Sequence, residues 1–274
     1  MSSRLFWILP LAVLACVPLP AAAETQTERV DEFVEVVRPL YPMFLGSVGI
    51  WETDTQRIEM SVRKLASGLA AVVSADCDAA KFKQDNCGLK MLRQPSTSME
   101  PTVLENELVV QKNYGPDEMP QRGDIIFFDR RPAYSDKPVA YVKRLAGLPG
   151  ETIELRKGIV YVDGRPLPQA ETKQTFTDIG GNSVRVLMET TPEGRTYRIG
   201  IGGTMSVPER DDTQPVHIPA GHYFVLGDNR HNSADSRYPD QIGENGFVAA
   251  DNITGHLVTI AASKDDARVG VVVE

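Results

Sequence analysis

The sequence predicts a mainly β protein whose core is split by an insertion and preceded by a helical extension. Apolar residues before position 94 recur at helical spacing, whereas short runs of β-branched and aromatic residues dominate from Thr102 onward. A Gly-, Pro- and Thr-rich stretch with weaker alternation separates two sets of these runs. The predicted division is an N-terminal segment at 1–23, a helical extension at 24–93, a β core at 94–164 and 218–262, an inserted β cap at 165–217 and a tail at 263–274.

The first 23 residues are interpreted as a targeting segment. Arg4 is followed by an apolar run at 5–17, and small residues end at Ala23. The run is shorter than the roughly 20 residues that span a bilayer, which favours a cleaved export signal. An uncleaved N-terminal anchor is the alternative, and Val-Leu-Ala-Cys at 13–16 leaves a lipoprotein signal open.

The cysteine content predicts one disulfide. Cys16 falls inside the targeting segment, which leaves Cys77 and Cys87, ten residues apart. In an exported protein an oxidising compartment favours their pairing. The sequence therefore predicts a Cys77–Cys87 disulfide.

Charge and composition exclude some partners. The formal net charge of −8 argues against nucleic-acid binding, which needs a basic surface. No His/Cys cluster has the spacing of a metal site. We expect no nucleic-acid partner, no metal and no cofactor.

The extension is expected to contain two helices. Thr25 and Glu28 have the spacing of a capping box, and Pro39 stops the first apolar stripe. A second stripe runs over 58–72 and begins at Thr53 or Asp54. Gly68 within it should cost up to about 1 kcal/mol of helix stability.

Later segments have strand character. Asp163-Gly164 is a strong hairpin turn signal, Gly200 to Gly203 is expected to be loop, and the tail from Ser263 is expected to be loose. The expected strands cover 108–110, 124–129, 139–142, 153–155, 159–162, 219–226 and 253–261.

Three blocks contain the candidate chemistry. The first, at 94–102, reads Gln-Pro-Ser-Thr-Ser-Met-Glu-Pro-Thr, where prolines exclude helix and favour a stiff loop. The second joins Tyr-Val-Lys-Arg at 141–144 to Leu-Ala-Gly-Leu-Pro-Gly-Glu at 145–151. The third, at 227–237, reads Gly-Asp-Asn-Arg-His-Asn-Ser-Ala-Asp-Ser-Arg. The first block alone is typical of an ordinary surface loop.

A serine nucleophile needs a neighbouring base. The four histidines, at 217, 222, 231 and 256, accompany no recognisable hydrolase motif. A lysine can serve instead if burial makes its neutral amine accessible. Lys143 ends the predicted strand at 139–142, although lysines at strand ends are usually solvated.

Taken in order, the three blocks resemble the bacterial type I signal peptidase family of Ser–Lys proteases, over about residues 94–260. The resemblance implies a signal-peptidase-like β core with Ser98 as nucleophile and Lys143 as general base. It implies that the Ser96 hydroxyl and the Ser98 backbone N–H bind the oxyanion. Met99 should pack under the nucleophile or simply belong to the core.

The third block supplies the support that the resemblance implies. Ser233 would orient the lysine amine, and Asp235 and Arg237 would brace the loop. Asp228 and Asn229 would form the turn that returns the loop under the site, and Arg144 matches the family pattern after the lysine. Without the resemblance, these charged residues would be interpreted as a solvated loop.

The resemblance implies an endopeptidase that removes signal peptides from exported preproteins after small residues. Substrates should bind as an added β-strand beside the strand leading to Ser98, at a membrane surface, in the periplasm or on the periplasmic face of the inner membrane. The chain departs from the family because residues 69–73 are too short for the usual membrane helix ahead of the serine block. A pilin-processing peptidase of conjugation systems with the same chemistry, or a non-catalytic exported peptide-binding β domain, is the alternative.

Overall fold

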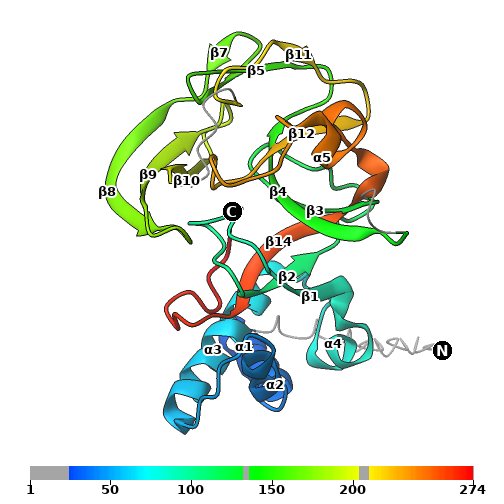
Figure 1. The fold of residues 1–274 in the computed structure, drawn as a ribbon. Coiled ribbons are helices and arrows are strands. Elements are labelled where there is room, and N and C mark those ends of the chain that lie inside the picture. The colour runs from blue at the N-terminus through cyan, green and yellow to red at the C-terminus, as the bar shows by residue number, and fades with distance from the viewer. Residues whose placement is uncertain (1–24, 132–135, 204–209, 274) are drawn as a thin grey trace, which may run out of the picture.

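A computed structural model describes residues 25–131, 136–203 and 210–273 of the chain. A helical extension lies at one end, a seven-stranded sheet lies in the middle, and smaller sheets lie at the other end (Figure 1). The prediction of a mainly β fold with an N-terminal helical extension is confirmed.

The extension contains four helices and one short 3₁₀ turn: α1 (Gln26–Val37), α2 (Tyr41–Ser47), α3 (Thr55–Val72), α4 (Ala79–Asp85) and η1 (Asn86–Gly88). The predicted capping box is present, with the Glu28 N–H donating to the Thr25 hydroxyl and the Thr25 N–H donating to the Glu28 carboxylate. Asp54 caps α3 by accepting from the Gln56 N–H at 2.8 Å. The two long helices therefore begin where the sequence predicts.

The sequence analysis missed α2 and α4 because both helices are short. α2 starts just after Pro39, with Pro42 in its first turn, where no N–H is needed. The predicted disulfide is present, and it closes the chain around α4 from Cys77 to Cys87 with 5.9 Å between their Cα atoms.

The central sheet is antiparallel, in the order β1-β2-β14-β3-β4-β12-β13. Its strands are β1 (Leu89–Arg93), β2 (Leu108–Lys112), β3 (Ile125–Arg130), β4 (Val139–Gly147), β12 (His222–Leu226), β13 (Val248–Ala249) and β14 (Ile253–Ala262). Three short helical segments, α5 (Pro239–Ile242), η3 (Glu244–Gly246) and η4 (Ala250–Asn252), connect β12, β13 and β14. β1 lies in the region expected to be helical and forms an edge of this sheet.

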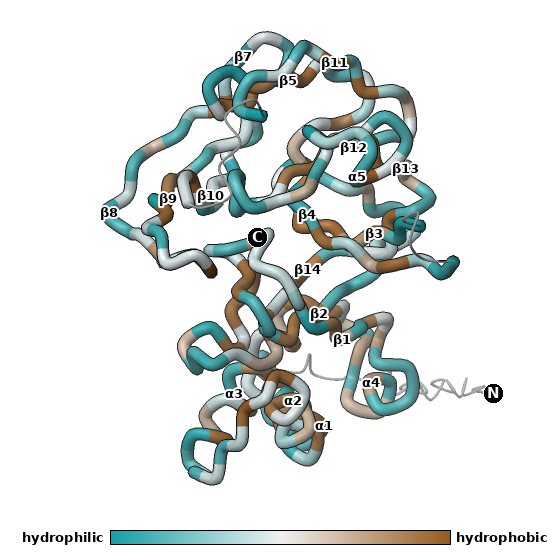
Figure 2. The backbone as a smooth tube through the Cα atoms, in the orientation of Figure 1, coloured by the Kyte–Doolittle hydropathy of each residue, from teal (hydrophilic) through white to brown (hydrophobic). Residues whose placement is uncertain are grey.

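The two faces of the sheet bury different sets of side chains. Leu108 and Val110 on β2 pack with the helices of the extension, whereas Val109 between them packs with Met99 on the other face. This alternation is the period-two pattern of a strand buried on both faces. Apolar segments are concentrated in the central strands and between the helices, whereas β8 (Gln169–Thr177) is largely hydrophilic (Figure 2).

The smaller sheets have the orders β10-β9-β8 and β11-β5-β6-β7. Their remaining strands are β5 (Thr152–Arg156), β6 (Ile159–Val162), β7 (Arg165–Pro166), β9 (Ser183–Thr190), β10 (Thr196–Gly202) and β11 (Val216–His217). The hairpin turn predicted at Asp163-Gly164 joins β6 to β7, with positive φ angles of 48° and 76°. The expectation of a loop at 200–203 is wrong for Gly200 to Gly202, because β9 pairs with these residues.

The tail is not loose, contrary to expectation. Val269 is buried, the Gly270 N–H donates to the Ile260 carbonyl at 2.8 Å, and Arg268 pairs with the buried Glu107. A methyl group at Gly68 would lie 2.5 Å from the Gly270 carbonyl oxygen, so this glycine permits the tail to approach α3 closely. One valine and one arginine with buried partners are enough to fix a segment that has no strand pattern.

Candidate active site

Ser98 lies on a loop that is closed at its base by backbone hydrogen bonds. The Gln94 N–H donates to the Glu107 carbonyl at 2.9 Å, and the Asn106 N–H donates to the Gln94 carbonyl at 2.6 Å. Met99 is fully buried and accepts at its carbonyl from two later N–H groups of the loop. These contacts hold Ser98, which is 8% exposed, in a defined position.

Lys143 is buried next to Ser98. Its Nζ donates to the Ser98 Oγ at 2.9 Å and to the Val142 carbonyl at 2.8 Å. Lys143 is only 5% exposed. Burial lowers its pKa to about 8, although the charges of Asp235 and Asp228 act in the opposite direction. The amine is therefore much closer to its neutral form at neutral pH than an ordinary lysine.

The sequence suggested that Lys143 ends a strand, but in the structure the strand continues past it. β4 continues to Gly147 because the buried Leu145 and Ala146 extend it and because β12 pairs with it beyond Lys143. Pairing with β3 and β12 fixes the β4 backbone around Lys143, and the lysine side chain lies in the buried part of this strand.

The two serines of the first block face each other. The Ser96 and Ser98 hydroxyl oxygens are 3.1 Å apart, and the Gln94 amide donates to Ser96 at 3.5 Å. Among the described residues, the Ser98 backbone N–H donates to no backbone carbonyl. The Ser96 hydroxyl therefore lies beside the Ser98 oxygen, and the Ser98 N–H is not used by a backbone acceptor of the described residues.

The 227–237 loop packs against both blocks. Arg144 and Asp228 form two hydrogen bonds of 2.7 Å, with each side chain 1% exposed. The Asn229 N–H donates to the Ser98 carbonyl at 3.1 Å, and its side-chain amide donates to the Thr97 carbonyl at 3.2 Å. The charged loop is therefore not solvated.

The far end of this loop forms its own brace. Asp235 accepts from the Gly227 N–H at 3.0 Å and from the Arg237 Nε at 2.8 Å. Burial favours a higher pKa for Asp235, but the ion pair with Arg237 outweighs it, so the pKa of this carboxyl lies below its usual value.

Ser233 does not make the hydrogen bond to Lys143 that the resemblance implied. Its hydroxyl oxygen is buried without a hydrogen-bond partner. A side chain at Gly227 would collide with this hydroxyl and would lie 2.6 Å from the Ser98 carbonyl oxygen, so Ser233 and the Ser98 loop meet there. One N–H of the Lys143 amine instead donates to the Val142 carbonyl.

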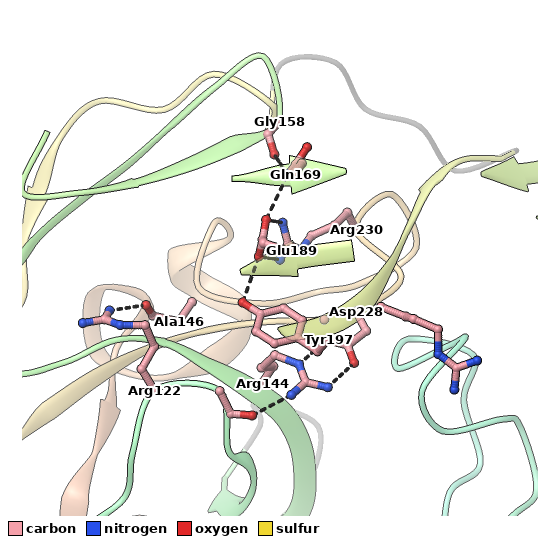
Figure 3. Close-up of polar contacts among 12 residues, drawn as sticks. Arg122, Arg144, Ala146, Gly158, Gln169, Glu189, Tyr197, Asp228 and Arg230 are labelled. Carbon is pink, nitrogen blue, oxygen red and sulfur yellow. Dashed lines mark hydrogen bonds and ion pairs between the residues drawn. The ribbon is translucent and has the colours of Figure 1, made fainter. Parts of the chain in front are cut away.

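Sequence reasoning missed the contribution of the cap. Glu189 of β9, fully buried, pairs with Arg230 of the 227–237 loop and accepts from the Tyr197 hydroxyl at 2.8 Å (Figure 3). The Tyr197 ring lies under the Arg144 guanidinium, 4.0 Å from ring centroid to Cζ. Strand alternation offered no signal, because Glu189 falls in the same phase as the exposed Arg185 and opposite to the apolar Val184, Val186 and Met188.

His231 of the third block is used to hold the cap. Its Nδ1 accepts from the Gly202 N–H at 2.9 Å, and its Nε2 lies 3.1 Å from both Asp211 carboxylate oxygens. The ring thus has both nitrogens engaged away from Ser98.

In the part of the chain that the structure describes, no three His, Cys, Asp or Glu side chains are grouped to hold a metal ion. Over the same ranges, no helix has the length and apolar character needed to cross a membrane.

Comparison with known proteins defines the class. A family model described as signal peptidase, peptidase S26, matches residues 86–262, which include all three blocks. The chain is therefore a peptidase, a hydrolase of peptide bonds. It belongs to the S26 family of signal peptidases.

Individual relatives agree with the family model. The signal peptidase I of Rickettsia typhi is 34% identical over 188 residues, covering 59% of this chain and 67% of the relative. That of Rickettsia canadensis is 34% identical over 168 residues, covering 52% and 62%. The chain thus spans about two thirds of the length of these relatives. A solved signal peptidase I from Enterococcus faecalis V583 is 29% identical and covers 51% of this chain and 97% of that one, at a TM-score of 0.27.

Proposed function

We propose that this chain is a serine endopeptidase that cleaves signal peptides from exported preproteins with Ser98 as nucleophile and Lys143 as general base. One observation carries the proposal: the buried Lys143 Nζ lies 2.9 Å from the Ser98 Oγ. That distance lets a proton pass directly between the two atoms. The family membership of the chain supports the same conclusion.

The reaction needs a neutral amine. As the Ser98 Oγ attacks the scissile carbonyl carbon, Lys143 accepts the hydroxyl proton. The proton then passes to the leaving amine as the C–N bond breaks, and the acyl-enzyme is hydrolysed by water that Lys143 deprotonates in turn. Burial, which lowers the pKa of this lysine to about 8, supplies the neutral form without a histidine.

The oxyanion of the tetrahedral intermediate would be bound by the Ser98 N–H and the Ser96 hydroxyl. The 3.1 Å separation of the two hydroxyl oxygens puts Ser96 within reach of an oxygen that develops beside Ser98. Removal of one such donor typically costs about 3–4 kcal/mol of transition-state stabilisation. Ser96→Ala should therefore lower kcat by roughly 10²–10³-fold.

Substrates would bind as an extended strand at the exposed edge of β1. This strand lies at the edge of the central sheet and leads directly into the Ser98 loop. An added strand gains affinity from backbone hydrogen bonds, and alternate side chains point to one face. We therefore expect small residues at the first and third positions before the cut. A cleavage map without enrichment of Ala, Gly or Ser there would contradict this mode.

The site of action would be the periplasm or the periplasmic face of the inner membrane. The N-terminal segment, which lies outside the described residues, and the Cys77–Cys87 disulfide both support export. A narrower client range, as in pilin-processing peptidases, would use the same chemistry. A panel of purified preproteins and pilin precursors separates the two alternatives. A non-catalytic domain is at odds with the peptidase family to which the chain belongs.

The deciding experiment is cleavage of one preprotein by three variants. Ser98→Ala should abolish cleavage and keep the fold, since one oxygen is removed. Lys143→Arg keeps the charge but not the base, because guanidinium does not deprotonate in proteins. It should be as inactive as Lys143→Ala. Circular dichroism provides the control for folding, and near wild-type cleavage by Lys143→Arg would exclude the lysine as base.

A further inference from the structure

Glu189 is a buried carboxylate that comes from the cap, outside all three sequence blocks. It is 0% exposed and is surrounded by donors from three different segments. Gln169 donates to it at 2.9 Å, the Tyr197 hydroxyl at 2.8 Å and Arg230 through both terminal nitrogens, one of them at 2.9 Å. A fully buried carboxylate with all its partners satisfied is expensive to desolvate and fixes geometry.

Two routes lead from Glu189 to the dyad. Arg230 belongs to the 227–237 loop and is adjacent to Asn229, whose N–H donates to the Ser98 carbonyl at 3.1 Å. Tyr197 places its ring 4.0 Å from the guanidinium of Arg144, which immediately follows Lys143. The carboxylate therefore connects through Tyr197 to Arg144 and through Arg230 to the 227–237 loop (Figure 3). The Asn229 N–H carries the second connection on to Ser98.

The backbone of the cap reinforces the first route. β10 lies parallel to the loop at Gly200, whose N–H donates to the Asp228 carbonyl at 2.8 Å. The Gly200 carbonyl accepts from the Arg230 N–H at 3.0 Å. A side chain at Gly200 would come within 2.9 Å of the Phe176 ring of β8, so glycine at this position lets that ring pack against β10.

We propose that Glu189 is a positioning residue for peptide-bond cleavage: it fixes the 227–237 loop and Arg144, so that the cap is part of the support of the Ser98–Lys143 pair. The proposal rests on the proposed function. Glu189 contacts neither Ser98 nor Lys143, so it acts through Arg230 and Tyr197. The carboxylate also neutralises the buried guanidinium of Arg230, since Asp228 pairs with Arg144 and Asp235 pairs with Arg237.

The test compares Glu189→Gln with a chemically matched control. Asp124 is likewise a carboxylate that accepts from an arginine of the cap, Arg195 at 2.8 Å, and from a tyrosine hydroxyl, Tyr114 at 2.8 Å. Its side-chain hydrogen bonds go to Tyr114, Gln121 and Arg195, and none of these residues belongs to the 227–237 loop. Asp124→Asn therefore removes a carboxylate charge from an arginine–tyrosine cluster, one more exposed than that of Glu189, without touching the loop.

We expect Glu189→Gln to lower kcat for a peptide that spans a signal-peptide cleavage site by roughly 10²-fold, the effect of a displacement of about 1 Å at reacting groups. KM should change by less than about threefold, because the edge of β1 is untouched. Asp124→Asn should keep kcat within about a factor of two. A folded Glu189→Gln variant with wild-type kcat, or an equal loss in the control, would overturn the proposal.

Amide hydrogen exchange measures the loop without using activity. Exchange at Gly227, Asn229 and Arg230, whose N–H groups donate in the native loop, should accelerate in Glu189→Gln and not in Asp124→Asn. If the wild type cuts no preprotein, the proposed function fails, and this exchange comparison still decides whether Glu189 fixes the loop.

If Glu189→Gln does not fold, the Tyr197→Phe variant tests the role of Glu189 instead. It removes one hydrogen bond to the carboxylate and keeps the ring under Arg144. A loss of about tenfold in kcat with faster loop exchange supports the role of Glu189. Wild-type kcat and wild-type exchange in Tyr197→Phe would refute it.

Discussion

The ion pairs of the 227–237 loop and those of the helical extension differ mainly in exposure. Each side chain of the three loop pairs is at most 3% exposed. In three pairs of the extension each side chain is at least 41% exposed. The loop pairs are Arg144–Asp228, Arg230–Glu189 and Arg237–Asp235, and the extension pairs are Arg38–Glu59, Arg63–Asp31 and Lys81–Asp76.

The difference separates geometry from stability. Buried pairs lose hydration on folding, and a hydrophobic replacement of the whole pair is often as stable, so their presence points to a positional role. Exposed pairs contribute little, and the extension is held instead by an apolar core that includes Phe33, Leu65 and Leu69, together with one disulfide. We therefore expect the buried pairs around Ser98 to fix positions, and the exposed pairs of the extension to contribute little to the free energy of unfolding.

The largest expected effect is the removal of one buried charge. Asp228→Ala leaves the Arg144 guanidinium buried without its partner, which should destabilise the protein by about 3–5 kcal/mol. Cleavage should fall with it, because Asp228 anchors the loop that contacts Ser98. Urea unfolding followed by circular dichroism measures the first effect, and peptide cleavage well below the unfolding midpoint measures the second.

A double replacement serves as the control for this prediction. Arg144→Met combined with Asp228→Leu removes both charges and should recover much of the stability but not the activity, if the pair fixes geometry. Recovery of both would show that the pair only stabilises the fold, and the contrast between the two regions would be lost.

Removal of the disulfide should have the next largest effect on the free energy of unfolding. Replacing both Cys77 and Cys87 with alanine should cost about 2–3 kcal/mol, because it frees a short closed chain around α4. At a temperature where the variant stays folded, kcat should remain unchanged, since α4 packs within the extension and not against Ser98 or Lys143. A fall in kcat at constant fold content would show that the extension also positions the site.

Much of the fold could be predicted from local patterns. The capping box at Thr25, the cap at Asp54, the Asp163-Gly164 turn and the Cys77–Cys87 pair are short-range signals, and all four are confirmed. The tail could not be predicted, because Arg268 finds Glu107 only after the chain has folded.

The candidate site divides in the same way. Ser98 and Lys143 lie in recognisable blocks, and their 2.9 Å contact agrees with the expected pairing. Glu189 lies 41 residues before Arg230, on a strand whose own sequence gives no reason for a buried charge. The contacts that support the Ser98–Lys143 pair therefore depend on tertiary structure and could not be predicted from local sequence. The hydrogen bond expected from Ser233 to Lys143 is absent for the same reason.

The third expected effect is a pH dependence of kcat/KM that should come from Lys143 and not from Lys81. Burial lowers the pKa of Lys143 to about 8, whereas the hydrogen bond to Asp76 raises the pKa of the exposed Lys81. Because the base must be neutral, kcat/KM should rise with pH and level off above about 8. Below that value it should fall tenfold per pH unit, or about 1.4 kcal/mol. A pH profile over 5–9 measures this limb, and Lys81→Met should not move it. A rate independent of pH between about 6 and 8 would contradict the assignment of the base.

The smallest effect should come from an exposed pair of the extension. Arg63 and Asp31 are 3.0 Å apart, with each side chain 57% exposed, so water and salt screen their attraction. Arg63→Gln should change the midpoint of thermal unfolding by no more than about 2 °C, with no effect on cleavage. The difference from wild type should shrink further when salt is raised, which separates a screened charge effect from lost packing of the arginine stem. A change as large as that of Asp228→Ala would mean that exposure does not divide the two regions. Stability in the extension would then depend on its surface charges rather than on its apolar core.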